Sequence, residues 1–345
     1  MVELSTRRQD GRHGGHVLDH DALSVTTVAS LTRGGLDDRT LRRAAEAGRL
    51  TRAAPGTYVD AAAWSALAPE ERHRAGALLR LDRTSSDVVA SHETAATLHG
   101  LPLLGRPPQI VHVIDRGRRT SAQGRAIARH AVPLRDDEVT VVDGVAVTTP
   151  ARTALDLCLG RGLGAGVVAL DHGLRHGLLG TEEVRDLLTR RSRSPGRRAA
   201  LVALDLADAS SASPLESASA VTAHLLGAPR PERQKTFRTP SGTFVGTVDF
   251  WWPEQGAVGE ADGRSKYLDP ALRDGRTAGA VVVAEKHRED ALRCLPEVRS
   301  FGRWGWAEAL DPRRLAVALT QLGIPLAHPP VLLRADTTDR RGHRA

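Results

Sequence analysis

The chain has 345 residues, of which 41% are hydrophobic and 3% aromatic, and its net charge at pH 7 is +7. This length suits two or three domains with cores of Ala, Val and Leu, and the absence of an apolar run of about 18 residues means that no transmembrane helix is expected. The first twenty residues lack the apolar region of a secretory signal, and the isolated Cys158 and Cys294 argue against a zinc site and favour a reduced, cytoplasmic setting.

Residues 1–20 are expected to be a disordered lead-in, and residues 21–60 predict a small DNA-binding unit. SVTTVASLTRGG is expected to form a short helix, LDDRTLRRAAEAG a second helix that ends at Gly48, and RLTRAAPGTYV a β-hairpin. This order is typical of a winged helix, whose second helix enters the major groove of double-stranded DNA while its wing contacts the backbone.

The arginines of this unit are its candidate DNA contacts. Arg39, Arg42 and Arg43 face outward on the second predicted helix, with Arg42 and Arg43 best placed for the groove. Arg49 and Arg52 flank the wing. The alternative is an ordinary solvated helix face, and the pattern alone leaves both interpretations open.

Residues 61–210 predict a mixed middle region. Its first half is expected to contain a strand and helix at SSDVVASHETAATLHGLPLLG, a strand at PPQIVHVID, and a hairpin across Asp143-Gly144. A helix should follow from Pro150, capped by Thr149. Three more helices are expected, over about 164–178, 181–190 and 196–207. The histidines of this region are predicted to be structural.

Residues 211–322 predict a third unit in the order helix, hairpin, helix, strand, helix. The first helix starts at Ser213, and the hairpin strands lie near 243–251 and 256–262. The tail over 334–345 is expected to be disordered. The whole chain is therefore predicted to have an α+β fold, ending in a mixed sheet flanked by helices.

Acidic side chains gather at the end of the predicted hairpin. Residues two apart in a strand share a face, so Glu260 and Asp262 should point the same way, and Asp249 in the preceding strand can lie beside them. Three carboxylates repel one another unless a cation joins them. Oxygen ligands suit Mg²⁺ or Mn²⁺, with Asp249 and Glu260 as the metal ligands. The alternative is a surface turn, because EADGRSKY contains a favourable Asp-Gly pair.

Two further residues would complete a catalytic site. Lys266 is one of three lysines in an arginine-rich chain, and it is placed to orient a metal-bound water or to neutralise a phosphodiester transition state. Glu216 follows Ser213 with the spacing of a capping box, and it is also placed to supply an acid to the metal. Both explanations of Glu216 remain open at this point.

Residues 210–320 resemble the PD-(D/E)XK nuclease superfamily, above all the branch near very-short-patch mismatch repair endonucleases. The resemblance rests on SPLES, VDFWWPE, GEADGRSKY, KHRED and RWGW. It implies a restriction-endonuclease-like fold, Mg²⁺-dependent DNA cleavage and metal ligands at Asp249 and Glu260. Lys286, Arg288 and Glu289 would lie on a helix beside the site, to contact DNA or to order the acids. The chain departs from the family where Asp262 replaces the usual lysine.

Residues 22–60, together with SHETAATLHGLP and TTPARTALDL, are similar to AbiEi-type antitoxins, which are winged-helix regulators. This resemblance implies DNA binding and a cognate toxin as a partner. The main hypothesis is a Mg²⁺-dependent DNA endonuclease in phage defence or DNA processing. The alternative is an antitoxin-type transcriptional repressor with an inactive nuclease fold. An RNA-directed nuclease ranks last, because the chain has no aromatic platform for stacking bases.

Overall fold

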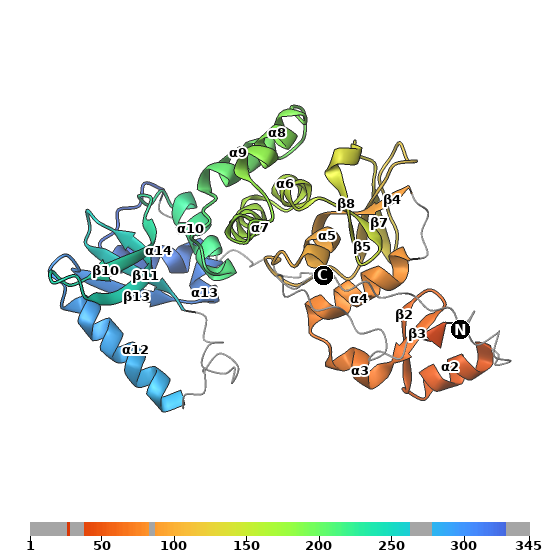
Figure 1. Ribbon diagram of the computed structural model, residues 1–345, viewed down its shortest axis with the longest axis horizontal. Helices are drawn as coiled ribbons and strands as arrows, with labels where there is room; N and C mark the ends of the chain where they lie inside the picture. The colour runs from red at the N-terminus through yellow and green to blue at the C-terminus, as the bar shows by residue number, and fades with distance from the viewer. Residues whose placement is uncertain (1–25, 28–37, 83–86, 263–277, 329–345) are drawn as a thin grey trace, which may run out of the picture. The chain divides into compact units, whose positions relative to one another are not determined.

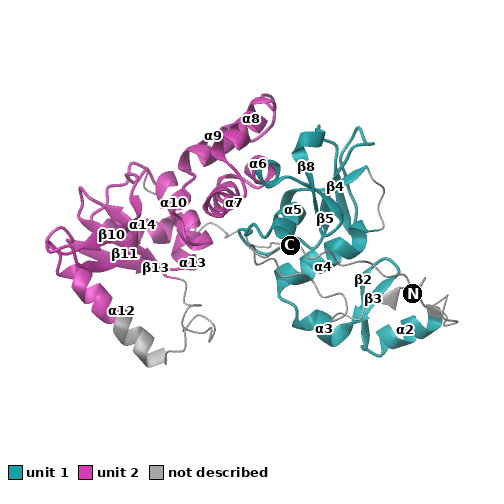
Figure 2. Cartoon of the chain, in the orientation of Figure 1, with its two compact units in different colours: residues 1–153 teal, residues 154–345 magenta. Residues whose placement is uncertain are grey.

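The computed structural model describes residues 26–27, 38–82, 87–262 and 278–328 (Figure 1). The chain forms two compact units, residues 1–153 and 154–345, and each is treated separately below (Figure 2). This boundary lies inside the middle region predicted over 61–210. The predicted lead-in at 1–20, the tail at 334–345 and Lys266 lie outside the described residues. No helix among those described is long and apolar enough to cross a membrane.

The first unit begins with a helix and a hairpin. Helix α2 (Asp38–Glu46) is followed by β2 (Leu50–Ala54) and β3 (Thr57–Asp60), which pair antiparallel, and β1 (Thr26–Thr27) adds a third strand in the order β1-β3-β2. The predicted second helix and the hairpin are confirmed. The first helix was predicted wrongly at Thr26 and Thr27, because these β-branched residues pair with the edge of β3 instead.

A six-stranded sheet completes the first unit, after α3 (Ala61–Ala66) and α4 (Pro69–Leu81). Its strand order is β6-β7-β5-β4-β9-β8, and helix α5 (His92–His99) packs against it. The strands are β4 (Val88–Ala90), β5 (Val111–Asp115), β6 (Ala122–Gln123), β7 (Ile127–His130), β8 (Val139–Val142) and β9 (Val145–Thr148). A short 3₁₀ helix, η1 (Asp136–Glu138), precedes β8. The hairpin across Asp143-Gly144 is confirmed.

Helices lead from the first unit into the second. They are α6 (Pro150–Gly160), which spans the boundary, α7 (Leu163–Arg175), α8 (Thr181–Thr189), α9 (Arg197–Leu206) and α10 (Pro214–Leu225). All five agree with the predicted helices to within a few residues. Pro150 and Pro214 each stand in the first helical turn, where the missing amide proton costs no hydrogen bond.

A four-stranded mixed sheet forms the centre of the second unit. Its order is β10-β11-β12-β13, and β12 and β13 run parallel. The strands are β10 (Glu232–Arg238), β11 (Phe244–Trp252), β12 (Ala257–Ala261) and β13 (Ser300–Trp304). The helices that follow β12 are α12 (Ala278–Arg293), α13 (Trp306–Ala309) and α14 (Pro312–Gln321).

Apolar side chains cover both faces of this sheet. Phe250 and Trp252 pack with residues of α10 and α14 on one face, while Trp251 and Val258 pack with Leu292 of α12 on the other. The apolar hairpin predicted from the sequence is therefore a buried one. The predicted α+β fold is confirmed for the described residues, with β10 and α13 as additions that the sequence pattern did not predict.

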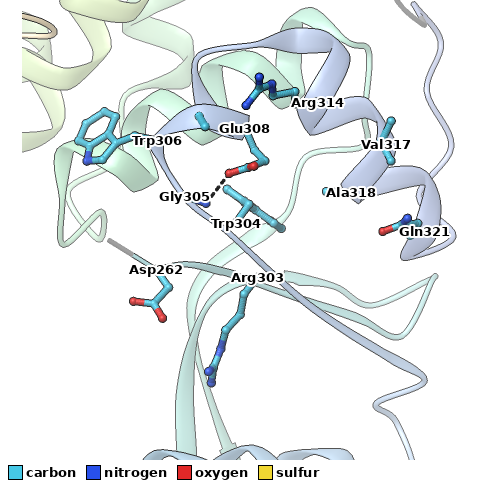
Figure 3. A pocket seen from close by; sticks show the side chains of 11 residues that line it. Asp262, Arg303, Trp304, Gly305, Trp306, Glu308, Arg314, Val317, Ala318 and Gln321 are labelled. Carbon is cyan, nitrogen blue, oxygen red and sulfur yellow. Dashed lines mark hydrogen bonds between the residues drawn. The ribbon is translucent and has the colours of Figure 1, made fainter. Parts of the chain in front are cut away.

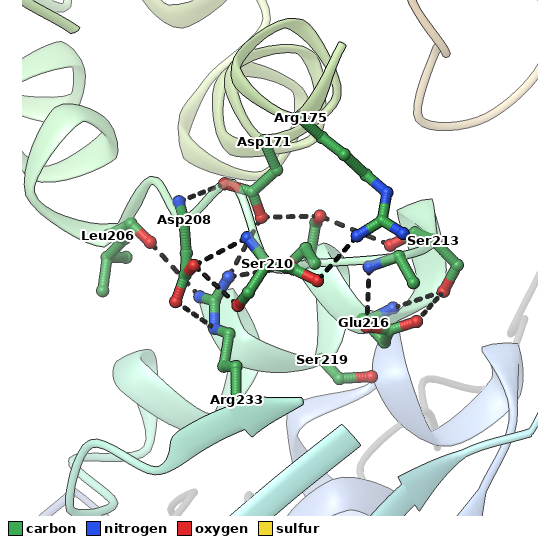
Figure 4. A network of polar contacts seen from close by, with 12 residues as sticks. Asp171, Arg175, Leu206, Asp208, Ser210, Ser213, Glu216, Ser219 and Arg233 are labelled. Atoms are coloured by element: carbon green, nitrogen blue, oxygen red, sulfur yellow. Dashed lines mark hydrogen bonds and ion pairs between the residues drawn. The ribbon is translucent and has the colours of Figure 1, made fainter. Parts of the chain in front are cut away.

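A buried polar network joins α7 to the sheet (Figure 4). Arg233 on β10 forms an ion pair with Asp171 on α7, at 3.0 Å between Nη1 and Oδ2, and both side chains are at most 5% exposed. Asp171 also accepts hydrogen bonds from Ser217 of α10 and the backbone amide of Asp208. Burial raises the pKa of Asp171, although these donors and Arg233 oppose the shift. The network explains why α7 belongs to the same unit as the sheet.

Candidate functional site

The first candidate site is the arginine surface of α2 and its hairpin. Leu41 points inward from α2 and is 3% exposed, while Ala53 and Val59 of the hairpin are also buried. This small core fixes which side of the helix faces solvent. All five predicted DNA contacts are exposed: Arg39, Arg42, Arg43, Arg49 and Arg52. The guanidinium groups of the helix and of the adjoining hairpin are therefore exposed to solvent. Exposed positive charge is what binding to a phosphate backbone requires.

The second candidate site surrounds Glu260, at the end of β12. Its carboxylate is buried, with Oε1 2.7 Å from Nη2 of Arg288 and Oε2 2.9 Å from Nε of Arg303. Arg303 lies beside Glu260 because β12 and β13 pair in parallel register, and Arg288 reaches it from α12. Arg288 therefore lies on a helix beside the acid, where the sequence placed it, while its predicted contact with DNA stays a prediction.

Two more carboxylates complete the charge cluster around the arginines. Glu285 contacts both Arg288 and Arg303, and Glu289 contacts Arg303 at 3.2 Å. Burial acts to lower the pKa values of both arginines, but the hydrogen bonds and charges of these glutamates and Glu260 raise them overall. The guanidinium groups therefore stay charged and neutralise the buried acid.

Asp249 and Glu216 lie together and share a neutral partner, Gln234. The side-chain amide of Gln234 donates to Glu216 Oε2 at 2.8 Å and to Asp249 Oδ1 at 3.0 Å. Asp249 Oδ2 also accepts from the backbone amide of Ala261, at 2.8 Å, which ties β11 to the end of β12. The backbone of Gln234 has a φ of +49°. This value is unusual for a residue other than glycine, and it costs backbone strain.

Glu216 caps its own helix. Ser213 is the N-cap of α10 and accepts from the backbone amide of Glu216, while its hydroxyl donates to Glu216 Oε1 at 2.8 Å. The amide of Ala212 donates to Oε2 at 2.9 Å. Of the two explanations left open above, these bonds account for Glu216 as a capping residue.

Asp262 lines one end of an open pocket of about 930 Å³, which Arg303 also lines (Figure 3). Trp306 lies at the same end, and Val317 and Gln321 line the other. The backbone amide of Asp262 donates to the carbonyl of Trp304 and so extends the β12–β13 pairing.

The described acids do not form a metal centre as placed. Within the ranges that the structure describes, no group of three or more His, Cys, Asp or Glu side chains could hold a metal ion. Both oxygens of Glu260 accept hydrogen bonds from arginines, and the two positive charges oppose the approach of Mg²⁺. This arrangement does not fit a divalent cation, and the metal site on Asp249 and Glu260 stays a prediction.

Three histidines of the first unit form a stack. The rings of His92 and His130 are 4.0 Å apart, and His112 Nδ1 lies 3.0 Å from His130 Nε2. Glu93, which is buried, lies 3.7 Å from His112. These contacts hold the start of α5 against β5 and β7, as a structural role for the histidines requires.

The middle of the chain is similar to a known protein family. Residues 87–204 match the AbiEi antitoxin C-terminal domain family, and this range contains both motifs, SHETAATLHGLP and TTPARTALDL, that suggested the resemblance. The match starts after the helix and hairpin at residues 38–60 and ends within α9. A search of curated proteins gives no match.

Among solved structures, the RV2827C protein from Mycobacterium tuberculosis is similar to this chain. The identity is 15%, the TM-score is 0.34, and the alignment covers 63% of this chain and 84% of that one.

Proposed function

We propose that this protein is a DNA-binding regulator of the antitoxin type. The observation that carries the proposal is the AbiEi antitoxin domain at residues 87–204, preceded by a helix and hairpin with five exposed arginines. The same chain thus combines a domain of antitoxins with a surface suited to phosphates. A transcriptional repressor in the cytoplasm, with a cognate toxin as its partner, is the function that accounts for both.

In this proposal α2 enters the major groove. Arg42 and Arg43 are adjacent on the exposed side of α2 and reach base edges or phosphates, while Arg49 and Arg52 of the hairpin contact the backbone. Arg39 lies one turn earlier on the helix and extends the contact along the groove. This part of the chain then acts as a winged helix, with α2 in the groove and the β2–β3 hairpin as the wing.

The C-terminal sheet serves binding and stability rather than cleavage. Nucleases of the family that this region resembles need acids available to a metal, and a lysine beside them. Here Glu260 is neutralised by Arg288 and Arg303. Asp262 stands where that lysine is expected, and a carboxylate there adds no positive charge to stabilise a transition state.

A gel-shift titration tests the proposal directly. The probe is a duplex from the region upstream of the protein's own gene, with an unrelated duplex of the same length for comparison. We expect tighter binding to the upstream duplex, and at least a tenfold loss for the double variant Arg42→Ala, Arg43→Ala. The matched control is Arg118→Ala, Arg119→Ala, which removes the same charge from an exposed loop. Equal binding by both double variants would refute the role of α2.

A second candidate function is the metal-dependent nuclease, for phage defence or DNA processing. The observation in its favour is that Asp249 contacts the end of β12 next to Glu260, with Glu216 linked to it through Gln234. Supercoiled plasmid incubated with Mg²⁺ or Mn²⁺ separates the two functions. We expect no nicking by the wild type. Nicking that disappears in Asp249→Ala would establish the nuclease and overturn the inactive-fold proposal.

A further inference from the structure

A second pocket lies in the first unit, between α3, α4 and the segment that leads into β5. Its volume is about 530 Å³, which is within the usual range for small-molecule sites. Three arginines line it, namely Arg72, Arg80 and Arg106, together with Trp64 and three prolines. No acidic side chain is among the described residues that line it, so the pocket is cationic with one aromatic and apolar wall.

Arg80 has a buried hydrogen-bond donor at this pocket that an anion would pair with. Its Nη1 donates to the carbonyl of Gly76 at 2.8 Å, while its Nε is buried and lacks a hydrogen-bond partner in the described structure. Burial lowers the pKa of the Arg80 guanidinium. A buried donor without an acceptor costs about 1–3 kcal/mol, and more when the group is charged. A bound anion would supply the acceptors and the opposite charge.

Gly76 creates the room in which Arg80 and Trp64 meet. A Cβ at this position would lie 2.9 Å from Nη1 of Arg80 and 3.6 Å from Cη2 of Trp64. Gly76 lies inside helix α4, where glycine is less favourable than alanine by about 1 kcal/mol. A side chain at this position would therefore displace the guanidinium group of Arg80 from its place beside Trp64.

Two other polar side chains at the pocket, Arg72 and His73, already have partners within the fold. Arg72 donates to the carbonyls of Trp64, Ser65 and Leu67, which holds the end of α3 and thereby Trp64 in place. His73 lies 3.1 Å from the hydroxyl of Thr94. Burial lowers the pKa of His73 to about 4, with the charge of His112 acting in the same direction, so the ring is neutral at pH 7. The guanidinium groups of Arg80 and Arg106 thus remain for a ligand.

We propose that this pocket binds a phosphorylated nucleoside, with the base against Trp64 and the phosphate at Arg80 and Arg106. Guanidinium groups bind phosphate oxygens through paired hydrogen bonds. A bare phosphate would use only the arginines and leave the aromatic and proline wall without a partner. A nucleotide uses both kinds of surface, and it fits the volume. The site is separate from the arginines of α2 and does not depend on DNA binding.

Isothermal titration calorimetry of the full chain tests the proposal, with AMP, GMP, adenosine and pyrophosphate as the probes. We expect AMP or GMP to bind, pyrophosphate to bind more weakly, and adenosine to show no heat of binding. Arg106→Met should weaken nucleotide binding at least tenfold. Arg106 is exposed, so this variant keeps the fold even if Arg80→Met does not. Arg118→Met is the matched control, because it removes a charge from another exposed loop.

The variant Trp64→Ala separates the two parts of the ligand. It should abolish the preference for AMP over pyrophosphate while leaving pyrophosphate binding within about twofold of the wild type. No binding of either nucleotide at millimolar concentration would overturn the proposal. Nucleotide binding that is equal in Arg106→Met and Arg118→Met would overturn it too. Stronger binding of pyrophosphate than of AMP would assign the pocket to inorganic phosphates instead.

Discussion

Arginine has opposite uses at the two ends of this protein. On α2 and its hairpin five arginines are exposed, and none of the five side chains is needed to fill the small core beneath them. At the end of β12, Arg288 and Arg303 are mostly covered and each contacts the buried carboxylate of Glu260. The first set is exposed to solvent, while the second set pairs with the protein's own acid.

This comparison teaches that burial, rather than residue type, separates a binding arginine from a structural one. An exposed guanidinium keeps its hydration and gains energy only when a phosphate releases counterions. A covered guanidinium beside a carboxylate is already paired, and removing either partner leaves the other charge buried and uncompensated. Matched pairs of variants, one at a buried side chain and one at an exposed side chain, measure this difference.

The largest effect is expected at Arg233, whose side chain is 5% exposed and pairs with the buried Asp171. The variant Arg233→Ala leaves Asp171 buried without its cation, and should lower the free energy of unfolding by about 3–5 kcal/mol. Arg238→Ala, on the same strand but exposed, should cost less than about 0.5 kcal/mol. Urea denaturation followed by circular dichroism measures both. Equal losses would show that burial does not decide the role of these arginines.

The next effect depends on pH and involves His73. Its pKa is about 4 in the folded chain against 6.5 for an ordinary histidine, because burial disfavours its charged form. The unfolded chain therefore binds more protons between these values. Stability is fully present above pH 6.5 and falls as the pH drops to 4, by about 3 kcal/mol at most. Thermal melts from pH 7 to pH 4 should show a smaller acid loss for His73→Gln than for the wild type.

His224→Gln provides the control for this titration, because His224 is exposed. Its acid loss should match that of the wild type. An unchanged pH dependence in His73→Gln would contradict a buried, neutral His73.

The third effect is the change in folding stability for Glu260→Gln. Its sign distinguishes a Glu260 that is paired with arginines from a Glu260 that belongs to a cluster of repelling acids. If Glu260 is neutralised by arginines, Glu260→Gln should destabilise the fold by about 2 kcal/mol, less than for a fully buried pair because Arg288 and Arg303 are partly exposed. If Glu260 belonged to a cluster of mutually repelling acids, the same change would stabilise the fold. Glu232→Gln, an exposed change on the same sheet, is the control for the melting temperature.

Sequence periodicity predicted most of the elements because each has a local signal. The proline and cap residues gave the starts of α6 and α10, and the Asp143-Gly144 pair gave the turn between β8 and β9. Thr26 and Thr27 were missed, because a two-residue strand depends on the distant edge of β3 rather than on its own neighbours. Strand β10 was missed because five of its seven residues have charged or amide side chains, a composition that is unusual for a strand.

The candidate site was predicted only in part, for a similar reason. The acids were identified by residue type, and Arg288 by its helix, but the pairing of Glu260 with Arg303 follows from the parallel register of β12 and β13. That register joins segments 43 residues apart and leaves no mark in the local pattern. Gln234 was not predicted either, since a lone amide between two acids has no spacing rule.

The central claim is that the exposed arginines of α2 bind DNA. The expected change in the free energy of DNA binding is the smallest of the effects above, but it tests this claim most directly. Fluorescence anisotropy measures the affinity for the upstream duplex at several salt concentrations. For Arg42→Ala, Arg43→Ala we predict at least a tenfold loss and a salt slope smaller by about 1 for each phosphate contact removed. For Arg118→Ala, Arg119→Ala we predict the wild-type affinity and slope. The same affinity and slope in both double variants would contradict the account.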